Sequence, residues 1–122
     1  MIDKILCTSQ YMNGVKKLQD KHRTDVLMKL DSIVLQLRKK EITKQYRNHP
    51  LQGKEASGAW ELHVTGDVLL VYRYDTDDCL IVSLKLLNLT DHNNIGSNRD
   101  KKTKYGGEAT IPYTDVGENK NA

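Results

Sequence analysis

The stretch "WELHVTGDVLLVYRY", Trp60 to Tyr74, decides the fold because its periodicity changes twice. Apolar and polar residues alternate as far as Val64, and Thr65-Gly66-Asp67 then forms a predicted turn. A nearly continuous apolar run follows from Val68. Alternation is typical of a strand with one buried face, and a Gly-Asp pair between two such runs is typical of a tight turn. This stretch therefore predicts an antiparallel hairpin.

The residues that follow extend the hairpin into a sheet. "YDTDD", Tyr74 to Asp78, predicts a second turn, and apolar residues alternate again from Leu80 to Leu86. A third antiparallel strand is expected there. The polar phase of these strands should face away from the core, and it carries His63, Arg73, Ser83 and Lys85.

The first part of the chain supplies the layer that covers this sheet. Ile2 to Leu6 predicts a short strand, Ser9 to about His22 a helix, and Thr24 to about Lys40 a second helix. Both helices carry one apolar stripe at helical spacing. Neither a helix pair nor a sheet buries its apolar face alone. We therefore predict an α+β fold, with two N-terminal helices packed on a twisted antiparallel sheet.

Length and composition set the limits of this interpretation. The chain has 122 residues, a net charge of +3 and a sequence pI of about 8.8. This length suits one domain, and the mild positive charge fits a polyanionic partner without requiring one. Cys7 and Cys79 belong to no CxxC pair, so we expect two buried, reduced thiols. No apolar run resembles a signal peptide or approaches the roughly 20 residues of a membrane span. A cytoplasmic protein is expected.

The composition changes near the C-terminus. Residues 97–122 are rich in glycine and charge and contain few large apolar side chains. Such segments bury too little apolar surface to offset their chain entropy. We predict a folded domain over residues 1–96 and a polar, disordered tail over residues 97–122.

Three histidines and an aspartate surround the predicted sheet. His49 precedes it, His63 lies on its first strand, Asp67 in the following turn, and His92 after its last strand. Histidine exchanges protons near neutral pH, and acid and base groups beside one phosphate can cleave RNA without a metal. Cations would stabilise the phosphate charge in the transition state; the candidates are Lys54, Arg73 and Lys85.

Simpler roles are open for each of these residues. A loop histidine is usually solvated, and Asp67 could serve only as a turn former. A zinc site is disfavoured, because no two histidines have HxH or HxxxH spacing. Trp60 is expected in the core rather than as a platform for a base.

Three sequence segments together resemble one family. "YRNHPLQG" (Tyr46 to Gly53), "GAWELHVTGDVLLVYRY" (Gly58 to Tyr74) and "LNLTDHNNI" (Leu87 to Ile95) are similar to the YafQ-like branch of the RelE/ParE superfamily of bacterial type II toxins. The resemblance covers roughly residues 1–96. It implies a ribosome-associated endoribonuclease that cuts mRNA without a metal or other cofactor. It also implies a small antitoxin, typically of ribbon-helix-helix type, through which the pair contacts operator DNA, and no membrane partner.

The resemblance also implies roles for the site residues. Asp67 and His92 would carry out the proton transfers, and His49 and His63 would hold and neutralise the scissile phosphate. This chain departs from the family pattern at three positions. Val68 and Ile95 stand where aromatic residues are common, and Trp60 stands where an arginine is common.

Two other functions fit the same fold. One is a toxin of the ParE branch, which binds gyrase without catalysis. The other is an inactive relative that acts only as a corepressor with its antitoxin. The three histidines and the aspartate favour the nuclease, because a toxin that only binds has no need of them.

Overall fold

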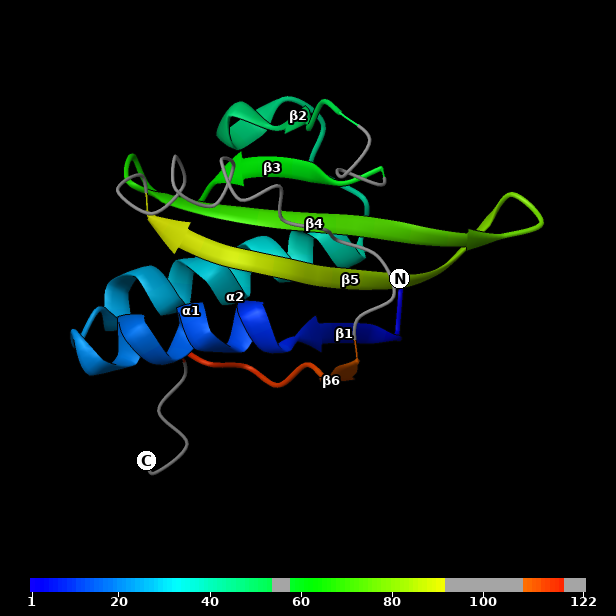
Figure 1. The fold of residues 1–122 in the computed structure, drawn as a ribbon. Coiled ribbons are helices and arrows are strands. Elements are labelled where there is room, and N and C mark those ends of the chain that lie inside the picture. The colour runs from blue at the N-terminus through cyan, green and yellow to red at the C-terminus, as the bar shows by residue number, and fades with distance from the viewer. Residues whose placement is uncertain (54–57, 92–108, 118–122) are drawn as a thin grey trace.

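The computed structural model describes residues 1–53, 58–91 and 109–117. In these residues two helices, α1 (Ser9–Asp20) and α2 (Thr24–Arg38), lie against one face of a six-stranded sheet (Figure 1). The predicted α+β architecture is confirmed. The other elements are β1 (Ile5–Thr8), the 3-10 helix η1 (Gln45–Arg47), β2 (His49–Pro50), β3 (Trp60–His63), β4 (Val68–Asp77), β5 (Leu80–Asp91) and β6 (Thr110–Pro112).

The sheet is mixed, with the order β2-β3-β4-β5-β1-β6. Strands β3, β4 and β5 form the predicted antiparallel meander. Strand β1 departs from a wholly antiparallel sheet, because it runs parallel to β5 with Ile5 opposite Leu84. The helix pair leads the chain away from β1 and back across the sheet, so the meander begins on the far side of β5 (Figure 1).

The main core lies between the helices and the sheet. Tyr11 and Val15 of α1, Leu30 of α2, and Leu62 and Leu84 of the sheet are all buried there. The packing of α1 on β5 depends on one small residue, since a Cβ atom at Gly14 would lie 1.9 Å from the carbonyl oxygen of Leu89. The alternation that predicted the strands therefore sorts Leu62 toward the core and its neighbours Glu61 and His63 toward the opposite face.

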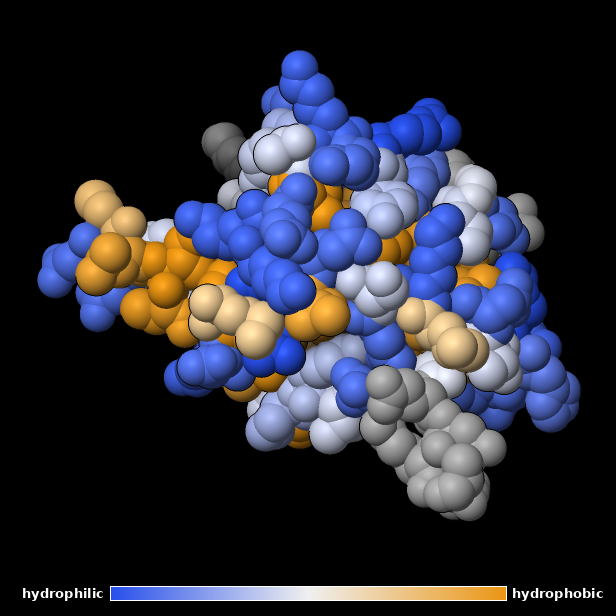
Figure 2. All heavy atoms as spheres, turned by 180° about the vertical axis from the view of Figure 1, so that it is seen from behind, coloured by the Kyte–Doolittle hydropathy of each residue, from blue (hydrophilic) through white to orange (hydrophobic). Residues whose placement is uncertain are grey.

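The hairpin formed by β4 and β5 projects beyond the helices (Figure 1). Apolar side chains gather at its projecting end (Figure 2), where Leu80 is 71% and Val82 48% exposed. Cys79 in the turn is exposed as well, so the prediction of two buried thiols holds for Cys7 but is wrong for Cys79, which has no layer to pack against. Trp60 is 38% exposed rather than in the core, because it lies at the end of β3.

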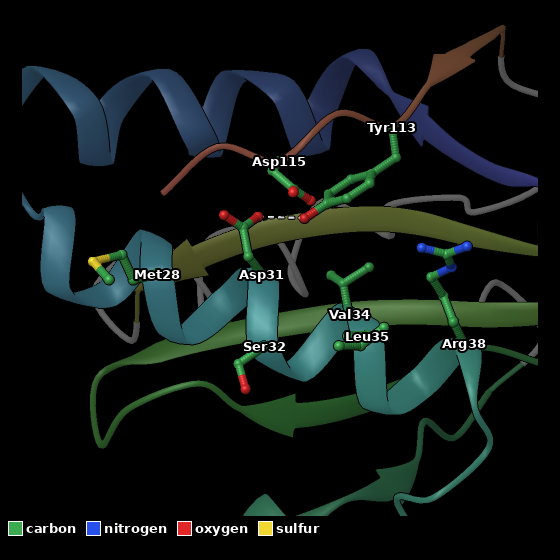
Figure 3. A pocket seen from close by; sticks show the side chains of 8 residues that line it. All are labelled: Met28, Asp31, Ser32, Val34, Leu35, Arg38, Tyr113 and Asp115. Atoms are coloured by element: carbon green, nitrogen blue, oxygen red, sulfur yellow. Dashed lines mark hydrogen bonds between the residues drawn. The ribbon is translucent and has the colours of Figure 1, made fainter. Parts of the chain in front are cut away.

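Residues 109–117, which we call the C-terminal strap, differ from the predicted disordered tail. Strand β6 in the strap pairs antiparallel with β1, with Ile111 opposite Cys7. The Asp31 carboxylate on α2 then accepts hydrogen bonds from the Val116 and Gly117 amides, at 3.0 and 2.6 Å, and from the Tyr113 hydroxyl (Figure 3). Such long-range partners leave no local pattern in the sequence. The other residues of the predicted tail lie outside the described ranges.

Candidate active site

His49 begins β2, and the loop before it, which contains η1, is fixed in place by several contacts. The loop includes Tyr46 and Arg47 in the left-handed backbone region, with φ of 59° and 55°. Non-glycine residues adopt this conformation at a cost of about 1 kcal/mol each, so surrounding contacts must impose it. Tyr46 packs against the main core, and the Asn48 side chain bridges the Thr43 carbonyl (3.0 Å) and the Tyr72 hydroxyl (2.6 Å).

The Tyr72 hydroxyl donates the hydrogen bond that anchors this loop to the sheet. Burial raises the pKa of Tyr72 well above the usual value of a phenol, and the nearby Tyr74 raises it further, while the bond to Asn48 lowers it. The hydroxyl therefore keeps its proton at neutral pH. It donates to Asn48 Oδ1, which precedes His49 directly. The backbone at His49 is thus tied to the middle of β4.

The His49 imidazole lies between two acceptors. Its Nδ1 is 2.8 Å from the Arg47 carbonyl oxygen, and its Nε2 is 3.3 Å from Oε1 of Glu61. A neutral imidazole carries one N–H, so only the doubly protonated ring can donate to both oxygens. The His49 side chain is 47% exposed and that of Glu61 only 5%. The arrangement therefore presents a partly exposed imidazole that rests on a buried carboxylate.

Glu61 is a site residue that the sequence analysis did not single out. It lies directly opposite His49 in the β2–β3 ladder. Glu61 and His63 are two residues apart on β3, so their side chains leave the same face of the sheet. Its place in the polar phase of the strand, two positions before His63, was visible in the sequence, but any solvent-exposed glutamate shares that feature.

His63 and Asp67 lie at one end of the β3–β4 hairpin. His63 is half-buried and pairs with Leu69 across the ladder, and the Val68 carbonyl accepts from the Val64 amide at 2.8 Å to close the turn. Asp67 is exposed in this turn, and its Oδ1 accepts a hydrogen bond from the Thr65 hydroxyl at 2.8 Å. The turn therefore orients the Asp67 carboxylate just beyond the strand that carries His63.

Arg73 and Lys85 face each other across β4 and β5, as the predicted outward phase requires. Both contact Asp75: Arg73 Nε lies 2.7 Å from Oδ1, and Lys85 Nζ lies 3.1 Å from Oδ2. Partial burial raises the pKa of Asp75, but hydrogen bonds and charges from Arg73 and Lys85 outweigh this and lower it below its usual value. The two predicted RNA-binding cations thus share one counter-charge.

The structure groups part of the predicted site. His49, Glu61 and His63 share the face of the sheet that lies opposite the helices, and Asp67 adjoins it in the turn after β3. Between this group and Arg73 lies a small apolar cluster of Leu51, Ala59, Val71 and Leu87. His92 and Lys54 lie outside the described residues. In the described part of the chain, no three His, Cys, Asp or Glu side chains are grouped to hold a metal ion.

One cavity of the described structure lies elsewhere. It has a volume of about 330 Å³ and lies between α2 and the C-terminal strap (Figure 3). Met28, Leu35 and Tyr113 contribute to its lining, and none of the predicted site residues does so among those described. The candidate site is therefore an open surface of the sheet rather than this cavity.

Comparison with known proteins identifies the family. Residues 3–97 match the family described as the bacterial toxin of type II toxin–antitoxin systems, YafQ. A copper-bound mutant toxin from Helicobacter pylori is 32% identical to this chain, covers 78% of it over 99% of its own length, and superposes with a TM-score of 0.62. YafQ in the DinJ–YafQ complex of E. coli is 26% identical, with 78% and 98% coverage and a TM-score of 0.61.

A more distant structure has the same fold. The YoeB/ParE toxin from Agrobacterium tumefaciens is 18% identical, covers 74% of this chain and 99% of its own, and gives a TM-score of 0.61. No curated protein matches the chain. None of the helices in the described ranges is long and apolar enough to cross a membrane. Because the family match extends over residues 3–97, the chain belongs to the YafQ family of bacterial type II toxin–antitoxin toxins.

Proposed function

We propose that this toxin is an mRNA endoribonuclease that acts on the ribosome without a metal or other cofactor. The observation that carries the proposal is the contact of His49 with the buried carboxylate of Glu61, on the face of the sheet that also carries His63. A buried carboxylate beneath a half-exposed imidazole orients the ring, which suits a group that faces a phosphate.

The reaction is an attack by the ribose 2′-oxygen on the adjacent phosphorus. Asp67 accepts the proton of the 2′-hydroxyl, the bond from phosphorus to the 5′-oxygen breaks, and His92 donates a proton to the departing oxygen. The products are a 2′,3′-cyclic phosphate and a free 5′-hydroxyl. The Thr65 hydroxyl donates to Oδ1 of Asp67 at 2.8 Å and so orients the carboxylate that is proposed as the base.

His49 and His63 stabilise the charge that develops on the phosphate. The two imidazole rings lie on one face of β2 and β3 and would contact the phosphate from one side of the scissile bond. Arg73 and Lys85, together with Asp75, contribute a net charge of about +1 farther along the same face, which favours the RNA backbone. Lys54 is assigned the same role from the sequence.

The antitoxin is the protein partner that this function requires. The similarity to E. coli YafQ in its complex with DinJ supports such a partner for this chain. We infer that the antitoxin is of the ribbon-helix-helix type and provides the only contact with operator DNA. The toxin acts in the cytoplasm, where its mRNA substrate is translated.

A cleavage assay on translating ribosomes tests the nuclease. Primer extension on a reporter mRNA, with and without EDTA, is compared between the wild type, His49→Gln and His92→Gln. We expect EDTA-insensitive cuts with the wild type, and losses of about a hundredfold or more with each variant. His22→Asn serves as the control, because His22 is exposed and lies between the helices.

Each contrary result has a distinct meaning. Normal cleavage by His92→Gln would show that the assignment of the acid is wrong. Growth arrest without any mRNA cleavage, retained in His49→Gln, would favour a toxin of the ParE kind that only binds. Repression of the operon without growth arrest would favour the corepressor.

A further inference from the structure

A cleft opens where the N-terminal residues leave the sheet. The Lys4 carbonyl accepts from the Leu84 amide at 2.9 Å, and the Ile2 amide donates to the Arg38 carbonyl at 2.9 Å. Residues 2–4 therefore cross from β5 to the end of α2. The ladder between β1 and β5 begins with Ile5 opposite Leu84, whereas β5 begins at Leu80. In the described structure, Leu80–Ser83 thus extends beyond β1 and has a sheet neighbour, β4, on one side.

We call this space the hairpin cleft. It has a volume of about 500 Å³, and its apolar lining includes Ile2, Ile81 and Val82. The β4–β5 register shifts between Asp75 and Thr76, which pair with Ser83 and Ile81, so Val82 has no partner on β4. Val82 is 48% exposed and the adjacent Leu80 71%. Neighbouring exposed apolar side chains on a projecting hairpin (Figure 2) indicate a binding surface more strongly than a single one does.

The rim of the hairpin cleft is basic. Lys4, Arg38, Lys39 and Lys40 line it, and the acidic residue of the lining, Asp3, lies 3.9 Å from Arg38. The charge of this lining is therefore about +3, as large as the net charge of the whole chain. Asp77 at the end of β4 and Asp78 in the following turn are exposed and are not part of the lining.

We propose that the hairpin cleft binds an extended acidic segment of a partner protein. Apolar side chains of the segment contact Ile81 and Val82, and its carboxylates face Lys4, Lys39 and Lys40. The phosphates of RNA would pair with the cations, but the RNA backbone would not bury the apolar side chains. The proposal rests on the proposed antitoxin partner, since that protein is the one to which the segment would belong.

The location of the hairpin cleft separates binding from catalysis. Strand β4 runs for 10 residues from the turn that carries Asp67 to the hairpin. A strand rises about 3.3 Å per residue, so the two ends of β4 are roughly 30 Å apart. A segment in the cleft would therefore leave Asp67 and the neighbouring His63 uncovered, and an antitoxin bound there would need a second part to silence them.

The test measures binding to the whole chain by fluorescence anisotropy. Three labelled probes of about ten units are compared: a peptide that alternates Glu and Leu, a peptide that alternates Glu and Ser, and single-stranded RNA. We expect the Glu-Leu peptide to bind at least tenfold more tightly than the Glu-Ser peptide. Val82→Asp should weaken binding of the Glu-Leu peptide about tenfold. Lys39→Glu combined with Lys40→Glu should weaken binding of both peptides and make that binding less dependent on salt.

Two controls match these changes. Ile111→Asp places the same charge at an apolar residue that is 52% exposed on β6, and Lys16→Glu reverses an exposed lysine on α1. Neither substitution should change the affinity for the peptides. Val82→Ser removes the apolar contact without adding charge, and it covers the case in which Val82→Asp does not fold.

The opposite results overturn the proposal. If RNA bound most tightly and Val82→Asp had no effect, the surface would be one for nucleic acid. If Ile111→Asp weakened binding of the Glu-Leu peptide as much as Val82→Asp did, the peptide would not bind in the hairpin cleft. The nuclease is tested separately, because Val82→Asp should cleave the reporter mRNA normally, whereas His49→Gln should lose cleavage and keep peptide binding.

Discussion

The Nε2 atom of His49 lies 3.3 Å from Oε1 of Glu61, a residue that faces it across the β2–β3 ladder and is almost wholly buried. The carboxylate contacts one ring nitrogen, and the Arg47 carbonyl oxygen, 2.8 Å from Nδ1, contacts the other. The orientation of His49 is therefore determined by two bonds that involve no substrate.

Glu61→Gln tests whether this contact matters for cleavage. The amide keeps the shape of the side chain but removes its charge, so the His49 imidazole loses its contact with a carboxylate. We expect kcat/KM for reporter cleavage to fall about tenfold while the urea midpoint changes little. In a double-mutant cycle, Glu61→Gln should have little further effect once His49→Gln is present. Equal losses in both backgrounds would contradict a role through His49.

Asp31→Ala should detach the C-terminal strap. The Tyr113 hydroxyl and the Val116 and Gly117 amides would lose their acceptor, at a cost of about 1 kcal/mol for each hydrogen bond. We expect the free energy of unfolding to fall by about 3 kcal/mol and amide exchange to accelerate at residues 110–117. Asp20→Ala, on the exposed end of α1, is the matched control. Unchanged exchange in the strap would show that Asp31 does not hold it.

Gly14→Ala should destabilise the whole domain. The added Cβ would lie 1.9 Å from the Leu89 carbonyl, so α1 must move away from β5. Overpacking of this kind should outweigh the better helix propensity of alanine and cost about 3 kcal/mol, which lowers Tm on the order of 10 °C. A Cβ at Gly66 meets no atom within 4 Å, so Gly66→Ala should leave Tm nearly unchanged. Equal effects of the two substitutions would be evidence against this packing.

Asp75 should make the stability depend on pH in the acid range. Its pKa is lower in the folded protein than in the unfolded chain, so the stabilisation is present above the ordinary carboxyl pKa and is lost as the pH falls through the folded value. Below about pH 4, the free energy of unfolding of the wild type should fall more steeply than that of Asp75→Asn. Urea titrations between pH 2 and pH 7 measure the two slopes. Parallel slopes would mean that Arg73 and Lys85 do not stabilise this carboxylate.

The sequence predicted the elements that have a local period. The alternation through Leu62 and the turn before Val68 gave the β3–β4 hairpin, and the helical stripes gave α1 and α2. It could not predict β2, because two residues have no period, or the parallel pairing of β1 with β5, which joins residues about 80 positions apart. The C-terminal strap was missed for the same reason, since Tyr113 and Asp31 are 82 residues apart.

The residues of the candidate site could likewise be predicted only in part from the sequence. Histidine and aspartate are conspicuous in loops and turns, so His49, His63 and Asp67 could be proposed from the sequence alone. Glu61 could not be distinguished from an ordinary solvent-exposed glutamate, because its contact with His49 depends on the pairing of β2 with β3. The ion pairs of Arg73 and Lys85 with Asp75 depend on the register of β4 and β5, which a single sequence does not specify.

The C-terminal strap also determines how far the protein can be shortened. The family match ends at residue 97, but β6 begins at Thr110 and is the outer neighbour of β1. A truncated protein that stops at the family boundary would leave one side of β1 without hydrogen-bond partners, and a bare strand of this kind invites pairing with other molecules. Truncation at residue 97 should therefore increase self-association, even though every residue of the proposed catalytic group is retained.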